Sequence, residues 1–282
     1  MQPLVFTAIV DRLIDLALEE DIGSGDITTD HLVPPQAQAR AVIVAKEELI
    51  VAGLDVARRV FERLDPRIVF QPHFCDGDSI PNGAVVVSLQ GRLAGLLTAE
   101  RTALNFLQHL SGIATHVRAY VRQLGHAKLR LVDTRKTTPG WRVLEKYAVR
   151  TGGAANHRMG LYDGVLIKDN HIAACGGITA AVERIRTRIS HLSKIEVETA
   201  TLDEVREALA ARADIIMLDN MDPATIGQAV SLINGRALVE VSGGVTARDL
   251  TVLAATGVDL ISCGALTHSA RSVDLSMRIE KQ

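Results

Sequence analysis

Residues 215–242 decide the fold, and they read IIMLDNMDPATIGQAVSLINGRALVEVS. An apolar run at 215–218 is followed by helical spacing at 223–233, and a second apolar run comes at 237–241. A strand, an amphipathic helix and another strand in succession indicate a βαβ unit, in which the two strands are parallel. This stretch therefore predicts part of a parallel sheet.

The same alternation extends over residues 129–262. Apolar runs recur at 129–132, 164–167, 195–197, 215–218, 237–241 and 260–262. Helical patterns lie between most of them, at 141–150, 178–189, 202–210, 223–233 and 246–255. Six such strands are too few for a complete eight-stranded barrel, so an incomplete barrel and an open doubly wound sheet both stay open.

The chain before residue 112 has a different rhythm. Residues 10–18 have helical spacing, and β-branched runs at 41–45 and 84–89 predict strands. We expect Thr98 to cap a further helix, which Ser111-Gly112 interrupts before the pattern resumes at 113–124. Strands followed by helices favour an α+β layer.

Composition excludes several classes of protein. The 282 residues include 31 basic and 33 acidic ones with 3% aromatics, which gives no basic or stacking surface for nucleic acid. The longest uncharged run, 102–117, is too short to span a bilayer, and we expect no signal peptide. Three widely spaced cysteines, Cys75, Cys175 and Cys263, fit a reducing cytoplasm.

Polar residues follow each apolar run of the second half. They are Asp133-Thr134-Arg135-Lys136, Lys168-Asp169, Glu196 with Glu198, Asp219-Asn220, Ser242-Gly243-Gly244 and Gly264. Because ligands bind at the carboxyl ends of parallel strands, these side chains are predicted to converge on one site. The period of two puts Glu196 and Glu198 on one face of their strand, and Glu240 and Ser242 on one face of theirs.

Positive charge gathers between residues 135 and 168, where seven basic residues face two acidic ones. Three at helical spacing are expected to form a solvated face: Arg142, Lys146 and Arg150. Four others lie at strand ends or in loops: Arg135, Lys136, Arg158 and Lys168. The second group predicts a cleft that binds anions, since Arg and Lys pair with carboxylate and phosphate.

Two late glycine-containing segments have the form of phosphate sites, at 242–244 and 264–267. Two carboxylates stand among these anion-binding groups, namely Asp219 and either Glu198 or Glu196. They suit a divalent ion such as Mg²⁺, or they balance nearby Arg and Lys.

Several contiguous motifs resemble the quinolinate phosphoribosyltransferase family. They are ERTALNFL (100–107), SGIAT (111–115), DTRKTTPG (133–140), EKYAV (145–149), NHRMGL (156–161), KDNHI (168–172), LDNM (218–221), SGG (242–244) and GALTH (264–268). The resemblance runs from about residue 21 to residue 272. The related ModD-like proteins share the TRK and HR segments but lack the intact KDNH segment that is present here.

The resemblance implies a fold and a reaction. The fold is an α/β sandwich (1–112, with the tail 270–282 returning to it) joined to an incomplete, seven-stranded α/β barrel (113–269). The reaction transfers the phosphoribosyl group of phosphoribosyl pyrophosphate to the ring nitrogen of quinolinate with decarboxylation. It gives nicotinate mononucleotide, pyrophosphate and CO₂ in NAD biosynthesis. A cytoplasmic homodimer or higher even oligomer with shared sites is implied, with Mg²⁺ and no tightly bound organic cofactor.

The resemblance also assigns roles to residues. Those for the pyridine dicarboxylate are Arg135, His157, Arg158 and Lys168, with Arg101 contributed across the dimer interface and Thr134 also in the substrate-binding set. Those for the phosphoribosyl donor are Lys136, Glu198, Asp219, Ser242, Gly243, Gly244, Ser262 and Gly264. Glu198 and Asp219 would hold Mg²⁺, and we favour Glu198 over Glu196 because it is nearer the strand end. The catalytic set is Lys136, Lys168, Glu198 and Asp219.

Two other functions compete with this one. Lys168 at a strand end could form a Schiff base in a lyase, although the dense cationic cluster exceeds what such an enzyme needs. A binding protein could instead retain the anion site without catalysis.

Overall fold

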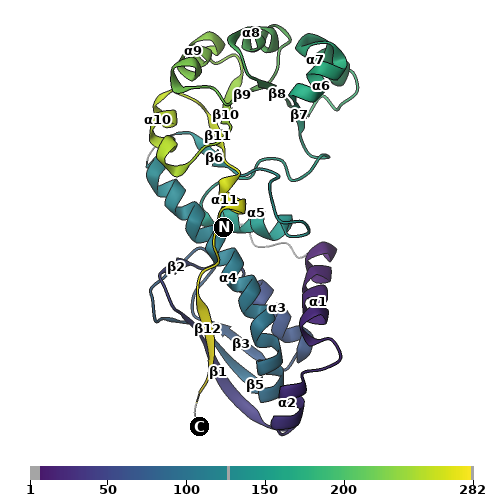
Figure 1. The fold of residues 1–282 in the computed structure, drawn as a ribbon, viewed down its shortest axis with the longest axis vertical. Helices are drawn as coiled ribbons and strands as arrows, with labels where there is room; N and C mark the ends of the chain where they lie inside the picture. Colours follow the sequence, from purple (N-terminus) through teal and green to yellow (C-terminus); the bar gives the residue numbers. More distant parts are fainter. Residues whose placement is uncertain (1–6, 126–127, 281–282) are drawn as a thin grey trace. The chain divides into compact units, whose positions relative to one another are not determined.

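The computed structural model describes residues 7–125 and 128–280, which divide into two compact units (Figure 1). Unit 1 comprises the described parts of Met1–Arg118, Thr137–Gly153 and Ser269–Gln282. Unit 2 comprises those of Ala119–Lys136 and Ala154–His268. The chain therefore leaves unit 1 and returns to it twice.

Unit 1 is built on a four-stranded antiparallel sheet in the order β12-β1-β5-β3. Its strands are β1 (Gln38–Ala45), β3 (Val69–Pro72), β5 (Val85–Arg92) and β12 (Leu275–Ile279), with a separate pair β2 (Leu49–Ile50) and β4 (Ser79–Ile80). Its helices are α1 (Ala8–Ile22), α2 (Ile27–Leu32), α3 (Leu54–Leu64), α5 (Arg142–Gly152) and most of α4 (Leu93–Leu124). The predicted helix at 10–18 and strands at 41–45 and 84–89 are confirmed by α1, β1 and β5.

Helix α4 differs from its prediction. It begins at Leu93 and runs without a break, so both the cap at Thr98 and the interruption at Ser111-Gly112 are wrong. The Thr98 hydroxyl, inside the helix, donates to Asp26 Oδ2 at 3.0 Å.

Contacts with distant segments explain the two small residues in α4. The Ser111 hydroxyl accepts a hydrogen bond from the Ala52 amide at 3.0 Å and donates to the Ala52 carbonyl at 3.3 Å. A Cβ at Gly112 would lie 2.1 Å from the Arg271 carbonyl oxygen. Glycine is needed there because another segment passes directly over the helix, and spacing along the sequence cannot reveal such a contact.

Unit 2 contains a six-stranded parallel sheet in the order β6-β11-β10-β9-β8-β7. The strands are β6 (Arg130–Val132), β7 (Val165–Ile167), β8 (Ile195–Thr199), β9 (Ile215–Asp219), β10 (Leu238–Ser242) and β11 (Leu260–Ser262). The helices are α6 (Asp169–Cys175), α7 (Ile178–Arg186), α8 (Leu202–Ala210), α9 (Pro223–Ile233), the 3-10 turn η1 (Ala247–Asp249), α10 (Leu250–Ala255) and α11 (Ala265–His268). The predicted strand–helix alternation is confirmed.

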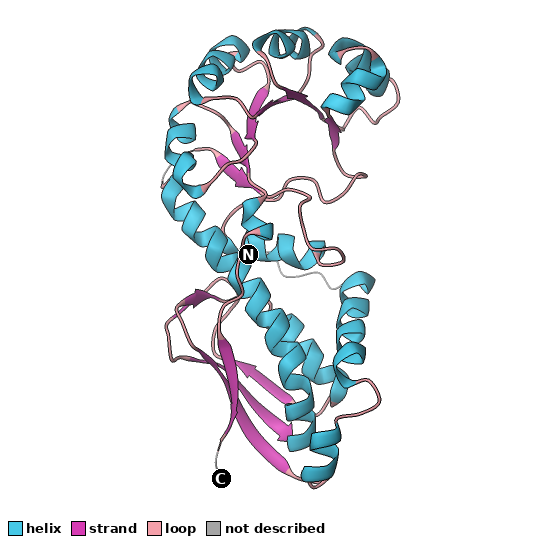
Figure 2. Ribbon diagram, in the orientation of Figure 1, coloured by secondary structure: helices cyan, strands magenta, loops and turns pink. Residues whose placement is uncertain are grey.

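Figure 2 shows the strands of unit 2 as a curved sheet with helices along its outer side. A doubly wound sheet carries helices on both faces, so the unit is an incomplete α/β barrel. Beyond the six strands, an isolated parallel bridge joins Val132 to Ala155 beside β6. The seventh strand that the resemblance implies is thus reduced to this bridge in the described chain.

Apolar helix faces cover the outside of this sheet. In α9 the buried residues are Ile226, Ala229 and Ile233, at the spacing of one helical face. Asp222 caps that helix by accepting hydrogen bonds from the Ala224 and Thr225 amides. No helix in the described ranges combines the length and apolarity needed to cross a bilayer.

Candidate active site

Unit 2 contains a cavity of about 680 Å³ at the carboxyl ends of its parallel strands. The predicted site residues of this unit all line it, namely Thr134, Arg135, Lys136, His157, Arg158, Lys168, Glu198, Asp219, Ser242, Gly243, Gly244, Ser262 and Gly264. Arg101 belongs to unit 1, where it is exposed on α4. Lining residues that the sequence analysis did not assign are Leu166, Met217, Asn220, Glu240, Val245, Thr246, Ala265 and His268.

Alternate residues of the strands face the cavity. In β9, Met217 and Asp219 line it. In β10, Glu240 and Ser242 do so. The predicted sharing of one face by Glu240 and Ser242 is confirmed, although the sequence analysis gave Glu240 no role in the site.

Arg135 and Arg158 both line the cavity, and their charges interact. Burial lowers the pKa of Arg158, and the nearby positive charge of Arg135 lowers it further. Arg158 is held in place by a hydrogen bond from Nη1 to the Gly164 carbonyl at 3.0 Å. Like charges held together in this way favour an anion between them.

Lys168 follows β7 and forms an ion pair with Glu198 on β8. Its backbone amide donates to Nδ1 of His171 at 3.0 Å, which fixes the start of α6. The lysine side chain is 46% exposed. Schiff-base lysines are desolvated or placed beside another cation, so this environment does not favour the lyase alternative.

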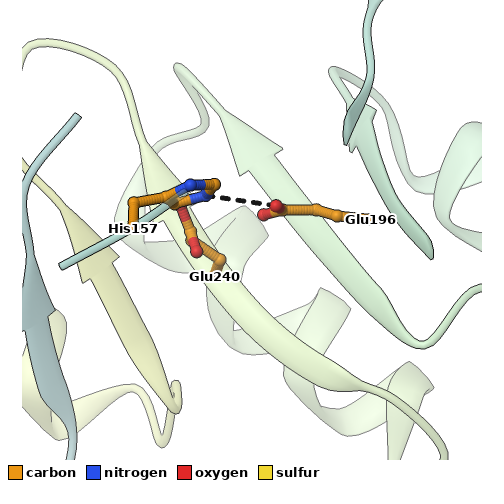
Figure 3. Close-up of side chains that lie close together, drawn as sticks. All are labelled: His157, Glu196 and Glu240. Carbon is orange, nitrogen blue, oxygen red and sulfur yellow. Dashed lines mark ion pairs between the residues drawn. The ribbon is translucent and has the colours of Figure 1, made fainter. Parts of the chain in front are cut away.

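A buried cluster of His157, Glu196 and Glu240 lies at the cavity (Figure 3). His157 Nε2 is 3.1 Å from Glu196 Oε2 and 3.5 Å from Glu240 Oε1. Burial alone would lower the pKa of His157, but the two carboxylates raise it. Burial also raises the pKa of Glu196, although the hydrogen bond with His157 opposes that rise.

This cluster has the side-chain types of a metal site, with one ligand atom from each residue within 4.8 Å of the others. The Arg158 amide, however, donates to Nδ1 of His157 at 2.7 Å, so the ring proton lies on Nε2. A metal would need the lone pair of Nε2, which this proton occupies. The cluster therefore fits a shared proton and does not fit a metal ion.

The structure separates the two glutamates of β8. Glu198 lines the main cavity and pairs with Lys168. Glu196 pairs with His157 and lines a second cavity of about 430 Å³, which His157, Arg158 and Glu240 share with the first. Glu198 is thus the one placed to reach a ligand in the main cavity.

The backbone segments that follow β10 and β11 line another part of the cavity, away from the Lys168–Glu198 pair. Gly243 and Gly244 have φ of 100° and 56°, in the region that favours glycine. Successive backbone N–H groups in such a turn can point to one side and bind an anion. Lys136 is fixed through its backbone, because the Thr267 hydroxyl donates to its carbonyl at 2.7 Å. The Thr267 contact places Lys136 beside the glycine segment that follows β11, and both glycine segments line the cavity.

One prediction about charge is wrong. Lys146 was expected on a solvated face of its helix, but it is 0% exposed in α5, beside the buried Glu145. Glu145 accepts a hydrogen bond from the Thr138 amide of the preceding loop at 3.2 Å, and its carboxylate also contacts Nε2 of His109 in α4 at 3.0 Å. A lysine at helical spacing carries no sign of such burial.

The fold and the cavity define a class, an α/β-barrel protein whose site suits anionic, phosphate-bearing ligands. Two family models match the chain: "Quinolinate phosphoribosyl transferase, N-terminal domain" at residues 26–111 and "Quinolinate phosphoribosyl transferase, C-terminal domain" at residues 113–278. The chain belongs to the quinolinate phosphoribosyl transferase family.

Relatives agree with this assignment along almost the whole chain. A probable carboxylating nicotinate-nucleotide pyrophosphorylase of Bacillus subtilis is 47% identical, with 95% of this chain and 92% of that protein covered. A decarboxylating quinolinate phosphoribosyltransferase of Nicotiana glauca is 40% identical, with 96% and 82% covered. The crystal structure of NadC from Streptococcus pyogenes has a TM-score of 0.95 at 43% identity, with 98% of each chain covered. The family's activity is quinolinate phosphoribosyltransferase (decarboxylating) activity in NAD biosynthesis.

Proposed function

We propose that the cavity of unit 2 carries out this reaction by bringing two anionic substrates together. The observation that carries the proposal is the convergence on one cavity of four cations from three segments of the chain: Arg135 with Lys136, Arg158, and Lys168. Quinolinate is a dianion and phosphoribosyl pyrophosphate carries several negative charges, so their approach is repulsive where water is excluded. Fixed cations offset that repulsion.

Quinolinate would bind at the side of the cavity formed by Arg135, Arg158, His157 and Lys168, with Thr134 beside them. Support comes from Arg158, whose pKa is lowered by burial and then by the positive charge of Arg135, since a bound carboxylate would offset that repulsion. His157 would present a ring held in orientation by Glu196 and Glu240.

The phosphoribosyl donor would bind at the opposite wall. Its 5-phosphate would accept hydrogen bonds from the segments that contain Ser242, Gly243, Gly244, Ser262 and Gly264, and Lys136 would contact its pyrophosphate. Glu198 and Asp219 would reach the ribose hydroxyls and Mg²⁺. Their oxygen donors suit that ion, and Glu198 already shares its charge with Lys168, which favours an ion held largely by substrate oxygens.

Bond formation needs no protein nucleophile. The ring nitrogen of quinolinate attacks the anomeric carbon, the C–O bond to pyrophosphate breaks, and the transition state is oxocarbenium-like. Glu198 and Asp219 would stabilise the positive charge that develops on the ribose, while Lys136 and Lys168 would stabilise the anions. Mg²⁺ would neutralise the departing pyrophosphate.

Decarboxylation would follow at the carbon next to the quaternary nitrogen. The C–C bond breaks, CO₂ leaves, and the electron pair stays on the ring beside the positive nitrogen until a proton replaces the carboxylate. Cations that held this carboxylate tightly would hinder its loss, so we expect the strongest Arg contacts on the other carboxylate. Equal loss of quinolinate affinity on replacing each arginine in turn would count against that order.

Purified protein with quinolinate, phosphoribosyl pyrophosphate and Mg²⁺ provides the direct test. The proposal expects nicotinate mononucleotide with stoichiometric CO₂. Binding of both substrates without turnover would support the binding-protein alternative, and borohydride trapping of a carbonyl substrate on Lys168 would support the lyase.

We also propose a homodimer, or a higher even oligomer, whose sites are completed by Arg101 of the neighbouring subunit. Mixing inactive Arg101→Ala and Lys168→Ala proteins tests this. Random exchange gives heterodimers with one intact site each, so about a quarter of wild-type activity should return. Dimers that exchange subunits without regaining activity would contradict the shared site.

The remaining parts of the proposal concern organisation and location. The domain boundaries are proposed at 1–112 with 270–282, and at 113–269. A cytoplasmic location is supported by three unpaired cysteines, of which Cys75 is exposed. Limited proteolysis and cell fractionation would test these two points.

A further inference from the structure

Asn220 follows β9 in an unusual backbone conformation. Its φ of 53° lies in the left-handed region, where side chains other than glycine are rare and asparagine is tolerated best. Its amide donates to the Ser242 carbonyl at 3.0 Å, one residue beyond the last register pair, Asp219 with Ser242. The backbone of Asn220 therefore joins the end of β9 to the start of the turn after β10.

The side chain of Asn220 makes two further contacts. Its Nδ2 donates to Asp219 Oδ2 at 2.6 Å, which restrains that carboxylate. Its Oδ1 lies directly against Gly243, because a Cβ built at that glycine would be 2.2 Å from Oδ1. Gly243 has a φ of 100°, so the turn needs glycine both for its conformation and for the space that Asn220 fills.

We propose that Asn220 is a positioning residue for the phosphoribosyl donor, which locks the Asp219 carboxylate to the Ser242–Gly244 turn. This inference rests on the proposed function, which assigns Asp219 to the ribose and Mg²⁺ and the turn to the 5-phosphate. Asn220 holds the two at a fixed separation, so the donor meets both at once without reorganisation of the wall.

Only asparagine meets all the requirements at this position. Glycine would adopt the backbone conformation but would release both the Asp219 carboxylate and the packing on Gly243. Aspartate would keep the shape and much of the left-handed preference, but it offers an acceptor where Asp219 needs a donor, and it would add a second negative charge. These two substitutions therefore separate the amide from the backbone.

The effect should be confined to one substrate. The contacts of Asn220 reach Asp219, Ser242 and Gly243, all of which are assigned to the donor. They do not include Arg135 or Arg158, which are assigned to quinolinate. A residue with a merely structural role would disturb both substrates or the stability of the fold.

The test compares Asn220→Gly, Asn220→Asp and the matched control Asn234→Gly. Asn234 is the C-cap of α9 with a φ of 47°, so the same substitution there acts on the same kind of backbone outside the cavity lining. Steady-state kinetics give kcat and KM for each substrate with Mg²⁺ present, and calorimetry gives Kd for quinolinate alone. Thermal melting reports on folding.

Asn220→Gly should lower kcat/KM for phosphoribosyl pyrophosphate by about tenfold or more, and Asn220→Asp by more than that. The Kd of quinolinate should stay within about twofold in both, and Asn234→Gly should stay within about twofold throughout. If the glycine variant unfolds, Asn220→Asp still tests the inference, because aspartate keeps the shape of the asparagine side chain.

Three results would overturn the inference. One is a kcat/KM for the donor within about twofold of wild type in both Asn220 variants. Another is an equal loss of affinity for quinolinate, and the third is an equal loss of activity in Asn234→Gly. Each presupposes turnover by the wild-type protein. A wild type that binds neither substrate would instead overturn the proposed function, so the two failures are distinguishable.

Discussion

Asp65 in unit 1 and Glu240 in unit 2 are each 2% exposed, but their surroundings differ. Both oxygens of Asp65 accept hydrogen bonds, from Arg67 at 2.9 and 3.1 Å and from Arg92 at 2.6 Å. In unit 2, Glu240 Oε1 and Glu196 Oε1 are buried and accept no hydrogen bond within the described chain, and the 3.5 Å ion pair of Glu240 Oε1 with His157 Nε2 is too long and poorly aligned to be one. One acidic site is saturated by its own unit, and the other is left incomplete.

The two buried acidic sites therefore play different parts in the two units. A carboxylate with all its hydrogen bonds made stabilises the fold and offers nothing to a ligand. A buried carboxylate oxygen without a hydrogen bond lowers the stability of the fold, because it has lost its water and gained no partner. Such groups are most often found at functional sites. Asp65 thus contributes its hydrogen bonds to the fold of unit 1, while Glu196 and Glu240 keep oxygens available beside the cavities of unit 2.

Replacing a cation of the cavity should have the largest effect. Arg135→Ala and Lys168→Ala are each expected to lower kcat/KM for quinolinate by about 10³-fold or more, because an anionic substrate then lacks its counter-charge. Their melting temperatures should stay near wild type. The unit 1 control Arg92→Ala should do the reverse, with normal turnover at 25 °C and a lower melting temperature. Near-normal turnover in both cavity variants would remove those assignments.

Two helical glycines extend the comparison to packing. Gly112→Ala in unit 1 should lower the free energy of unfolding by about 2 kcal/mol or more, since the new methyl group meets the Arg271 carbonyl at 2.1 Å. Gly227→Ala in α9 of unit 2 meets nothing within 4 Å and should raise it by up to about 1 kcal/mol. Denaturant titration measures both, and a stable Gly112→Ala protein would show that the contact at Arg271 is easily displaced.

Neutralising one buried carboxylate in each unit sharpens the contrast. Glu240→Gln keeps the size of the side chain but weakens the hold on His157, so KM for quinolinate should rise by about tenfold without loss of stability. Asp65→Asn should leave kinetics unchanged and lower the melting temperature, because Arg67 and Arg92 lose their counter-charge. If Glu240→Gln melted lower and kept its KM, the cluster in unit 2 would be structural too.

Acid pH should produce the smallest of these effects. The hydrogen bonds from Arg67 and then Arg92 lower the pKa of Asp65 in the folded protein. A lowered pKa stabilises the fold above the unfolded value of about 3.9 and is lost as pH falls through the folded value. The difference in melting temperature between wild type and Arg92→Ala should therefore be full at neutral pH and shrink below about pH 4. A difference that stays constant would show that the arginine acts through packing alone.

Much of unit 2 could be predicted because its chemistry follows its periodicity. In β9 and β10 every second residue lines the cavity, and the residue types at the strand ends predicted lining residues such as Glu198 and Asp219. Unit 1 was less predictable. The signals at Thr98 and Ser111-Gly112 were read as a helix start and break, but contacts with Asp26, Ala52 and Arg271 override them.

Burial and local pairing were also beyond reach of the sequence. Lys146 has the spacing of an exposed residue and is fully buried. The choice between Glu196 and Glu198 was decided by position along the strand, and only coordinates reveal that Glu196 is engaged by His157. Asn220 was visible beside Asp219, but its left-handed backbone has no signature in a single sequence.

The pairing of β12 with β1 has a consequence for how the chain matures on the ribosome. Residues 275–279 are synthesised after all of unit 2, yet they pair with β1, which begins at Gln38, and form an edge of the sheet of unit 1. During translation, the backbone groups of β1 that pair with β12 stay unpaired until all of unit 2 has been synthesised. The sheet of unit 1 is therefore completed only after unit 2 has been synthesised, and until then the open edge of β1 could pair with other chains unless chaperones shield it.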